Sequence, residues 1–470
     1  RRDVAEGYIF LDWFAIPQVT CRQEGVNEDM TRSKAALAVQ SIPAYVEMCN
    51  LFVALVPELR HSTTENTCNY STWLQRGWCR AELWCHVLSN KVDTSVILVH
   101  SSKEAEFMFP LDWQENSVAT GAFTVEADRK VVTQLAQVAL DSKIEHLSSS
   151  RKSQNDLALY RFYLAYRHRM LGQEPVAWDL YNFLRCFRFQ TFEEAVKDSR
   201  HMNGLLCALF AEDVHMLRLL LKYKADVNCR LYGLHALGYF DSQTLLMAAM
   251  KSYQSITVVK TLLDHRASPN LSGERGERAA FLAKSPLHVK LLMEANADLS
   301  SPCGSYGLTP LTGVASYSDT PTVIAMLAAS CDPNPSLSGI GGSPLHGAVV
   351  FSRGNRHAHL SAQMLLKQRA DVNCRARPQG RYALLCQAAR THCAIMGFSS
   401  SSIVMRVFAS WPGITPLGMS AMVGDRTLTH LLLEWSAELV ANDRGDTPED
   451  LAKRMGHSHL LSALVPCFTT

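Results

Sequence analysis

The sequence contains no apolar run near the roughly 18 residues that a membrane-spanning helix needs. It has 14 cysteines in 470 residues, but no two of them stand at Cys-x-x-Cys spacing. A chain of this length can bury enough apolar surface to fold without disulfides, and scattered thiols are typical of a reducing compartment. We therefore expect free thiols, no membrane span and a cytoplasmic location.

Strong charge of one sign and the common ligand-binding motifs are also missing. The formal net charge is only +2, whereas binding of nucleic acid by bulk charge needs a basic stripe. The chain has no Gly-x-x-x-x-Gly-Lys, no His-Glu-x-x-His and no calcium-binding loop. Pro344 stands where the Gly-x-Gly beginning at Gly339 would need its third glycine. We expect no nucleic acid, no resident cofactor and no metal.

What the sequence does contain is enough apolar material for several cores. Hydrophobic residues make up 47% of the chain and charged residues 19%. That balance is typical of folded rather than disordered chains. The length allows roughly two to four domains.

Two phrases recur in the C-terminal half. "ADVNCR" occurs at 225–230 and again at 370–375, and Thr-Pro-Leu or Ser-Pro-Leu phrases begin at Thr309, Ser343 and Thr415. Ser343 can cap a helix whose first turn holds Pro344, and a leucine-rich second helix follows in each copy. These phrases, repeated with a period near 33 residues, resemble the ankyrin repeat.

The resemblance covers residues 203–465. It implies an all-α solenoid of seven to eight divergent units that binds a protein partner on its concave face. The units diverge from the family pattern where a glycine usually ends the second helix. Non-glycine residues, which adopt left-handed backbone at a cost, occupy this position here: Lys224, Arg266, Asn296, Ser330, Arg369 and Ser436.

Unit lengths are also irregular. Tyr382 stands 39 residues after Ser343 and 33 before Thr415, so we expect a sixth unit that begins near Tyr382. The stretch 393–404 is then an insertion between its two helices, and the finger loop before Thr415 is nearly absent.

The N-terminal third alternates strand and helix patterns. Apolar runs at 7–18, 50–57 and 94–100 predict strands, and residues 33–49 have helical spacing. This order predicts a parallel sheet, whose ligands sit beyond the carboxyl ends of the strands, where Asp12 lies.

The phrase Trp78-Cys79-x-x-Glu82, after the strand "LFVALVP", looks like the second half of a Toll/interleukin-1 receptor (TIR) domain, a flavodoxin-like fold. The segment from "FLDWFAIPQ" to "LFVALV" is also similar to the heterokaryon-incompatibility domain. The match covers roughly residues 7–100. The first strand of a TIR domain has no counterpart in residues 1–6, so we expect this domain to be truncated at its N-terminus.

The resemblance implies two different functions. In TIR domains that cleave NAD the glutamate of this phrase is catalytic, which implies catalysis by Glu82 on NAD as substrate, bound by Asp12 and Trp78. Other TIR domains are assembly modules, which implies oligomerisation or signalling without chemistry. We expect an interaction scaffold, with the NAD-cleaving enzyme as the alternative.

These observations predict a multidomain chain. Residues 1–147 form the TIR-like α/β domain, residues 148–202 a helical connector rich in aromatic residues, and residues 203–465 the ankyrin array. The connector is too apolar to stand alone, so we expect it to cap the first repeat or to join it to the N-terminal domain.

Overall fold

The computed structural model describes residues 37–38, 41–62, 65–91, 93–149, 154–197 and 202–464. Its N-terminal part holds a three-stranded sheet of order β1-β4-β5. β1 (Phe52–Leu55) runs parallel to β4 (Val96–Ser101), and β5 (Glu104–Phe107) is antiparallel to β4. The predicted parallel pairing of the second and third strands is confirmed. The strand predicted over 7–18 lies outside the described residues, and the TIR-like fold stays a prediction.

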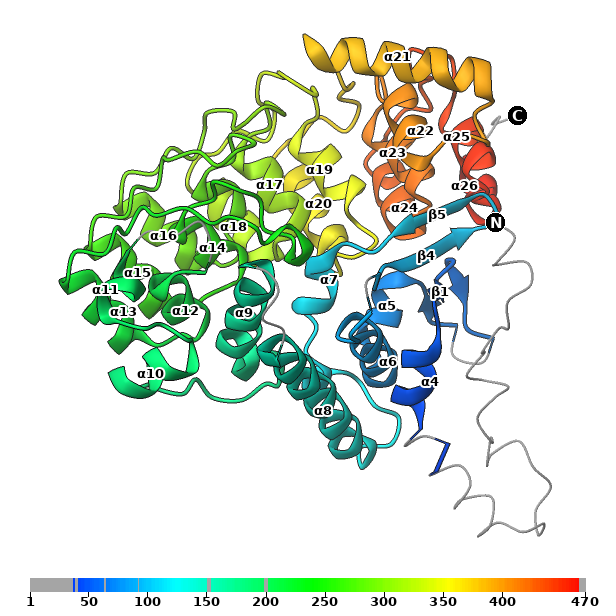
Figure 1. Ribbon diagram of the computed structural model, residues 1–470. Coiled ribbons are helices and arrows are strands. Elements are labelled where there is room, and N and C mark those ends of the chain that lie inside the picture. Colours follow the sequence, from blue (N-terminus) through cyan, green and yellow to red (C-terminus); the bar gives the residue numbers. More distant parts are fainter. Residues whose placement is uncertain are drawn as a thin grey trace, which may run out of the picture.

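Helices cover this small sheet. α5 (Tyr70–Gln75) and α6 (Gly77–Val87) connect β1 to β4, and α6 packs between α4 (Ile42–Met48) and α8 (Asp128–Ser149) (Figure 1). A short hairpin of β2 (Leu59–Arg60) and β3 (Thr67–Cys68) precedes α5.

Side chains of α6 form the centre of this part. Leu83 and Trp84 are fully buried, and Trp84 meets Trp113 edge to face with ring centroids 6.1 Å apart. This packing explains the tryptophan-rich phrase at 76–84, because aromatic rings supply much of the buried area of so small a core.

Three helices join the two parts: α9 (Gln154–Met170), α10 (Leu180–Cys186) and α11 (Phe192–Val196). α9 packs against α8 on one side and against α12 (Gly204–Phe210), the first helix of the array, on the other. The contact is aromatic, since the Phe162 and Phe210 ring centroids lie 4.9 Å apart. The segment rich in aromatic residues therefore couples the N-terminal part to the array; the boundaries at 147/148 and 202/203 stay predictions.

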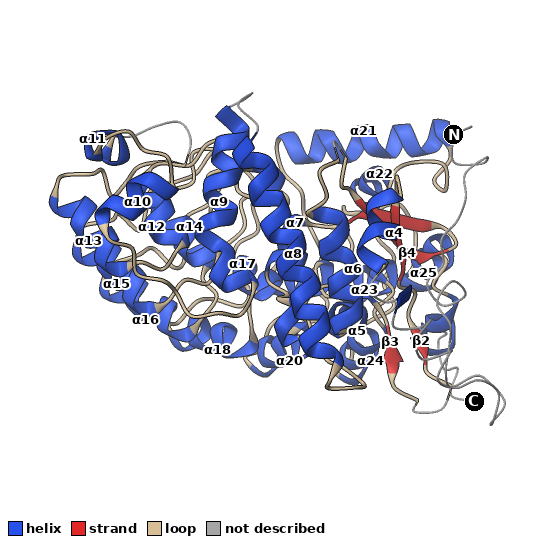
Figure 2. Cartoon of the chain, turned by 60° about the horizontal axis from the view of Figure 1, so that its bottom comes forward, coloured by secondary structure: helices blue, strands red, loops and turns tan. Residues whose placement is uncertain are grey.

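The C-terminal part is a curved stack of helix pairs (Figures 1 and 2). Its first helices are α12, α14 (Leu245–Lys251), α17 (Pro310–Tyr317), α19 (Pro344–Val350), α23 (Pro416–Val423) and α25 (Pro448–Met455). Its second helices form one arc-shaped row in Figure 2: α13 (Val214–Lys222), α15 (Ile256–Asp264), α16 (Pro286–Glu294), α18 (Thr320–Ala328), α20 (Ala358–Lys367) and α24 (Arg426–Glu434).

Two pairs are incomplete. The first helix of the third pair is reduced to the 3₁₀ helix η4 (Ala279–Leu282), so the phrase that begins with Ser285 starts the second helix α16 instead. The array ends with α25, the 3₁₀ helix η5 (Ser458–Leu460) and α26 (Leu461–Leu464).

The repeated Thr-Pro-Leu phrases begin helices as predicted. The Ser343 side chain accepts a hydrogen bond from the His346 backbone N–H, and Pro344 lies in the first turn. Thr309, Thr415 and Thr447 cap α17, α23 and α25 in the same way. Each cap satisfies a backbone donor that the helix itself leaves without a partner.

The ends of the second helices also follow the prediction. All six non-glycine residues at the helix-ending position have left-handed backbone, with φ between +55° and +67°. They are Lys224, Arg266, Asn296, Ser330, Arg369 and Ser436. The array therefore accepts a local strain of about 1 kcal/mol at most of its repeats.

The predicted sixth unit differs from the structure. α21 (Arg381–Met396) and α22 (Ile403–Ser410) pack on each other outside the stack, while α19 contacts α23 and α20 contacts α24 directly. Ala376 N donates to Ile414 O at 2.9 Å, and Gly413 N donates to Ala376 O at 2.8 Å. These bonds close the finger loop across its insertion, so residues 377–412 are a helical hairpin inserted into one finger.

The N-terminal part lies along the edge of the array that is formed by turns between first and second helices. Arg169 of the connecting helix α9 pairs with Glu212 at 2.8 Å beside the first pair, and Ser101 Oγ donates to Met455 O at 2.6 Å beside the last. Between them, Arg353 in the turn between α19 and α20 pairs with Glu104 of β5 at 2.6 Å. Gln114 of α7 (Pro110–Gln114) also contacts one finger loop, between α13 and α14, where it donates to Leu237 O at 3.0 Å. The opposite edge, made of finger loops, carries α21 (Figure 1).

Candidate functional site

Glu82, the predicted catalytic residue, is half-buried on α6. Burial raises the pKa of the nearby Cys85 thiol to about 12, and the negative charge of Glu82 adds to this shift. Trp78, one turn earlier, donates from its indole Nε1 to Asp128 Oδ2 at 3.0 Å, which ties α6 to the start of α8. Asp12 lies outside the described residues.

The phrase around Glu82 also contains a buried arginine. The Arg80 guanidinium donates to Ser117 O at 2.6 Å and to Asn116 Oδ1 at 3.0 Å, and burial lowers its pKa to about 10. Arg80 thus holds the loop that follows α7, an ordinary structural role. The two cavities described next contain neither Glu82 nor Trp78 in their linings. Catalysis by Glu82, and binding of NAD by Asp12 and Trp78, stay predictions.

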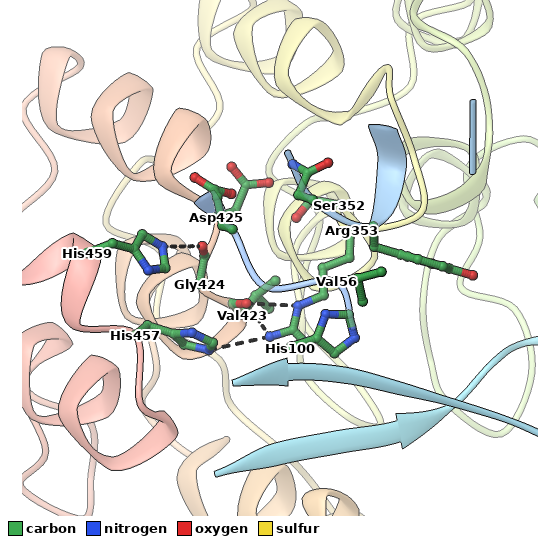
Figure 3. A pocket seen from close by; sticks show the side chains of 12 residues that line it. Val56, His100, Ser352, Arg353, Val423, Gly424, Asp425, His457 and His459 are labelled. Atoms are coloured by element: carbon green, nitrogen blue, oxygen red, sulfur yellow. Dashed lines mark hydrogen bonds between the residues drawn. The ribbon is translucent and has the colours of Figure 1, made fainter. Parts of the chain in front are cut away.

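An ion pair joins the N-terminal part to the array, and Figure 3 draws one member of it, the Arg353 side chain, beside Val423 and His457. Arg353, in the turn between α19 and α20, donates to both carboxylate oxygens of Glu104 on β5, at 3.0 and 2.6 Å. His457 Nε2 lies 3.1 Å from the same carboxylate. Burial alone would raise the pKa of Glu104, but the Arg353 charge and the His457 hydrogen bond lower it to about 2.

A cavity of about 40 Å³ adjoins this ion pair. Its lining includes Glu58, His100, Asp425 and His459. Burial raises the pKa of Glu58 to about 7, and the Asp425 charge contributes to the rise. The space holds a few water molecules at most. We therefore interpret this cavity as a packing gap at the contact between the two parts rather than as a ligand site.

A larger cavity of about 370 Å³ lies on the concave side of the array. η4, α17 and α19 contribute to its floor, and the finger loops flank it. The inserted helix α22 and Phe109, which precedes α7, contribute further walls. Its lining is mostly apolar and aromatic, and includes Phe240, Phe281, Tyr306, Phe351, Phe408 and Trp411. This volume and lining are typical of ligand sites.

The finger edge carries an exposed apolar helix. α21 buries one stripe, made of Tyr382, Cys386, Ala389 and Cys393, against α22 and the fingers. The rings of Tyr382 and Tyr306 stack with centroids 5.7 Å apart. The outer side also exposes apolar side chains, because Leu384 is 73% exposed and Ile395 76%, with the polar Gln387 and Thr391 exposed between them.

Sequence reasoning missed both the concave cavity and this outer stripe. The sequence did contain a signal for an unusual surface in this region, because residues 372–424 contain no aspartate or glutamate. Such a stretch, with arginines at both its start and its middle, indicates a surface with its own electrostatic character.

The described residues contain neither a cluster suited to a metal ion nor a helix suited to cross a membrane. The structure there shows no group of three or more His, Cys, Asp or Glu side chains that could hold a metal ion. None of the helices in the same ranges combines the length and the apolar character that a bilayer crossing needs.

Capped helix pairs, loops between them and left-handed ends to the second helices define a helical repeat array. A scan against protein-family models found no match, and a search of the curated proteins found none either. Solved structures that resemble the chain include the ankyrin repeat domain of human ASB11, at 17% identity and a TM-score of 0.39. The similarity covers 55% of this chain and 96% of that domain. So loose a similarity adds nothing to the geometry, and the description as a helical repeat array rests on the helix pairs themselves.

Proposed function

We propose that this protein is an interaction scaffold whose ankyrin-type array binds a protein partner along the finger edge of its concave face. The observation that carries the proposal is the outer stripe of α21, where Leu384, Ala388 and Ile395 are all exposed. A helix of a globular protein normally buries its apolar side and turns polar residues outward. A second apolar side that faces water is typical of a binding surface.

The arrangement of the chain also favours this edge. The N-terminal part contacts the turns between first and second helices through Ser101 and Glu104, on the opposite edge. A partner therefore approaches from the fingers, where the stacked rings of Tyr306 and Tyr382 hold α21 against the finger loop.

The positive charge of the inserted hairpin indicates which kind of partner surface would bind it. Arg377 and Arg381 are exposed at the start of the inserted hairpin, and residues 372–424 contain no acidic side chain. Neither arginine forms an ion pair within the described part of the chain. An acidic rim around an apolar centre is the complementary surface, which we propose for the partner.

The test is affinity capture with the full chain, followed by mass spectrometry. The variant Leu384→Ser/Ile395→Ser removes the apolar stripe without touching the buried side of α21. Ile324→Ser is the matched control, because Ile324 is 47% exposed on α18 in the outer row of helices. We expect partners that both the native chain and the control retain and the double variant loses. An identical set of captured proteins from all three, or binding of anionic vesicles in place of proteins, would contradict the proposal.

We propose in addition that the N-terminal part mediates assembly, as the TIR-like resemblance implies. The support is the exposure of two apolar side chains on β1, Val53 and Leu55. Sedimentation velocity over a hundredfold range of concentration tests this role. Purely monomeric behaviour throughout that range would remove the assembly role and leave partner binding by the array intact.

A further inference from the structure

We propose that the concave cavity is a binding site for a small amphipathic carboxylate, a molecule with one anionic group and a long apolar chain. This inference goes beyond the protein-partner role and does not depend on it. It rests on the walls that three parts of the chain build around the cavity, on two cations without an ion-pair partner at one end, and on the apolar character of the other end.

The walls of the cavity come from three separate parts of the chain. The repeats supply the floor and the fingers, α22 supplies Val407 and Phe408, Trp411 follows directly after α22, and the N-terminal part supplies Phe109. Trp411 is held in place because its indole Nε1 donates to Ile340 O at 2.7 Å. Walls on several sides suit a small molecule better than the broad surface of a folded partner.

Cationic groups mark the end formed by the second and third repeats. The Lys251 ammonium lies 4.7 Å and the Arg275 guanidinium 3.6 Å from the centroid of the Phe240 ring. Lys251 is only 4% exposed, and its Nζ donates to Gly238 O. Neither cation has an acidic group within ion-pair distance in the described ranges, although the more distant charges of Glu277 and Glu115 act on Lys251, and Arg275 Nη1 donates to Tyr306 Oη at 3.4 Å. A buried ammonium without an acidic partner is costly, and a bound anion removes that cost.

The acidic groups nearby are already engaged. Glu277 also lines the cavity, but its carboxylate accepts hydrogen bonds from Gln243 Nε2 at 2.8 Å and from Arg275 N at 3.1 Å. The other cation in the lining, Lys284, pairs with Glu115 of the N-terminal part. Lys251 and Arg275 therefore remain to meet the anionic group of a ligand. Burial lowers the pKa of Lys251 to about 8, and an adjacent carboxylate would raise this pKa again.

The opposite end of the cavity is apolar. Val350 and Phe351 of the fifth repeat face the same space as Val407, Phe408 and Trp411. Neighbouring first helices pack about 8–10 Å apart, so the two ends of the cavity are separated by the span of more than one repeat. A long apolar chain that extends from the cations toward α22 matches this layout.

Isothermal titration of the full chain with laurate below its micellar concentration and with dodecanol below its solubility limit tests the proposal. Val407→Trp fills the apolar end. Val404→Trp is its control, because Val404 lies one turn away on α22, is 55% exposed and is not part of the lining. Arg275→Gln removes an exposed cation at the mouth of the cavity.

We expect laurate to bind the native chain and Val404→Trp alike, and to bind Val407→Trp at least tenfold more weakly. Laurate should bind more tightly than dodecanol, and Arg275→Gln should reduce that preference about tenfold or more, since a hydrogen bond to a charged group contributes that much. The proposal is overturned if laurate does not bind, if Val407→Trp binds it as the native chain does, or if dodecanol binds equally well. If Val407→Trp does not fold, the comparison of the two ligands on the native chain and Arg275→Gln decides the question.

Discussion

Arg353 and Glu104 are separated by 249 residues in the sequence and form a two-point ion pair, with N–O distances of 3.0 and 2.6 Å. The pair joins the turn between α19 and α20 to the edge strand β5, and both side chains are largely buried. The Arg353 guanidinium also donates to Val423 O, at the end of α23, at 2.9 Å. One side chain thus connects the N-terminal part to two successive repeats.

Removing one partner of this pair should be far more costly than removing both. We expect Arg353→Met to lower the free energy of unfolding by about 3–5 kcal/mol, because it leaves a buried carboxylate without its cation. The double variant Arg353→Met/Glu104→Met should recover most of that loss. Urea unfolding of the three chains measures the difference. A single variant within about 1 kcal/mol of the native chain would show that the pair behaves as an exposed one.

The same carboxylate should make stability depend on pH at the acidic end. The pKa of Glu104 is lowered from 4.5 to about 2, so its contribution is complete above 4.5 and is lost as the pH falls toward 2. The loss should be about 3 kcal/mol. Unfolding curves from pH 5 to pH 2 measure it against Arg353→Met/Glu104→Met, whose curve should be flatter; parallel curves would contradict the assignment.

A second pH dependence comes from His346 in the repeat phrase of α19. Its Nε2 bonds to Ile414 O at 3.0 Å, and burial lowers its pKa from 6.5 to about 4. The folded state therefore holds it neutral, so stability is complete above 6.5 and falls as the pH drops toward 4. The full effect is about 3 kcal/mol. His346→Gln should lose this dependence in thermal melts between pH 7 and pH 4, and an unchanged slope would refute the explanation.

The left-handed ends of the second helices can be relieved by glycine. We expect Lys224→Gly, Arg369→Gly and Ser436→Gly each to raise the free energy of unfolding by about 0.5–1 kcal/mol, since glycine adopts φ near +60° without strain. Arg218→Gly, at an exposed position in the middle of α13, is the control and should lower it by a similar amount. Chemical unfolding of each variant measures the change in the free energy of unfolding. If all three glycine variants are less stable than the native chain, the left-handed residues are not strained as we propose.

For NAD cleavage we expect a negative result. Neither cavity contains Glu82 in its lining, and Trp78 is bonded to Asp128. Nicotinamide release from NAD, followed by chromatography, should be the same for the native chain, Glu82→Gln and buffer. Release by the native chain that Glu82→Gln abolishes would establish the enzymatic alternative instead.

Local features of this fold could be predicted from the sequence. The caps at Ser343 and Thr415 depend on residues only three positions apart, and the left-handed ends depend on a single position in each repeat. The parallel pairing of β1 with β4 was visible as two short apolar runs separated by a helix. Such signals are short-range and repeat along the chain, so each copy supports the others.

The inserted hairpin could not be recognised in the same way. Tyr382 and Thr415 are 33 residues apart, which equals the repeat period, so spacing alone places a unit there. Only the contact of α19 with α23 and the bonds that join Ala376 to Gly413 and Ile414 show that the stack bypasses this segment. The Arg353–Glu104 pair and the concave cavity likewise arise from contacts between distant segments, for which the sequence holds no local pattern.

Site-specific photo-crosslinking tests the scaffold role most directly. A photoreactive phenylalanine analogue would replace Leu384 on the outer stripe of α21 in one chain, and Ile324 on α18 in the other. In cell extract, irradiation of the chain labelled at position 384 should give a discrete crosslinked protein band that an excess of unlabelled native chain suppresses. The chain labelled at 324 should give none. Equal crosslinking from the two positions, or no discrete band from position 384, would contradict a partner-binding surface at the finger edge.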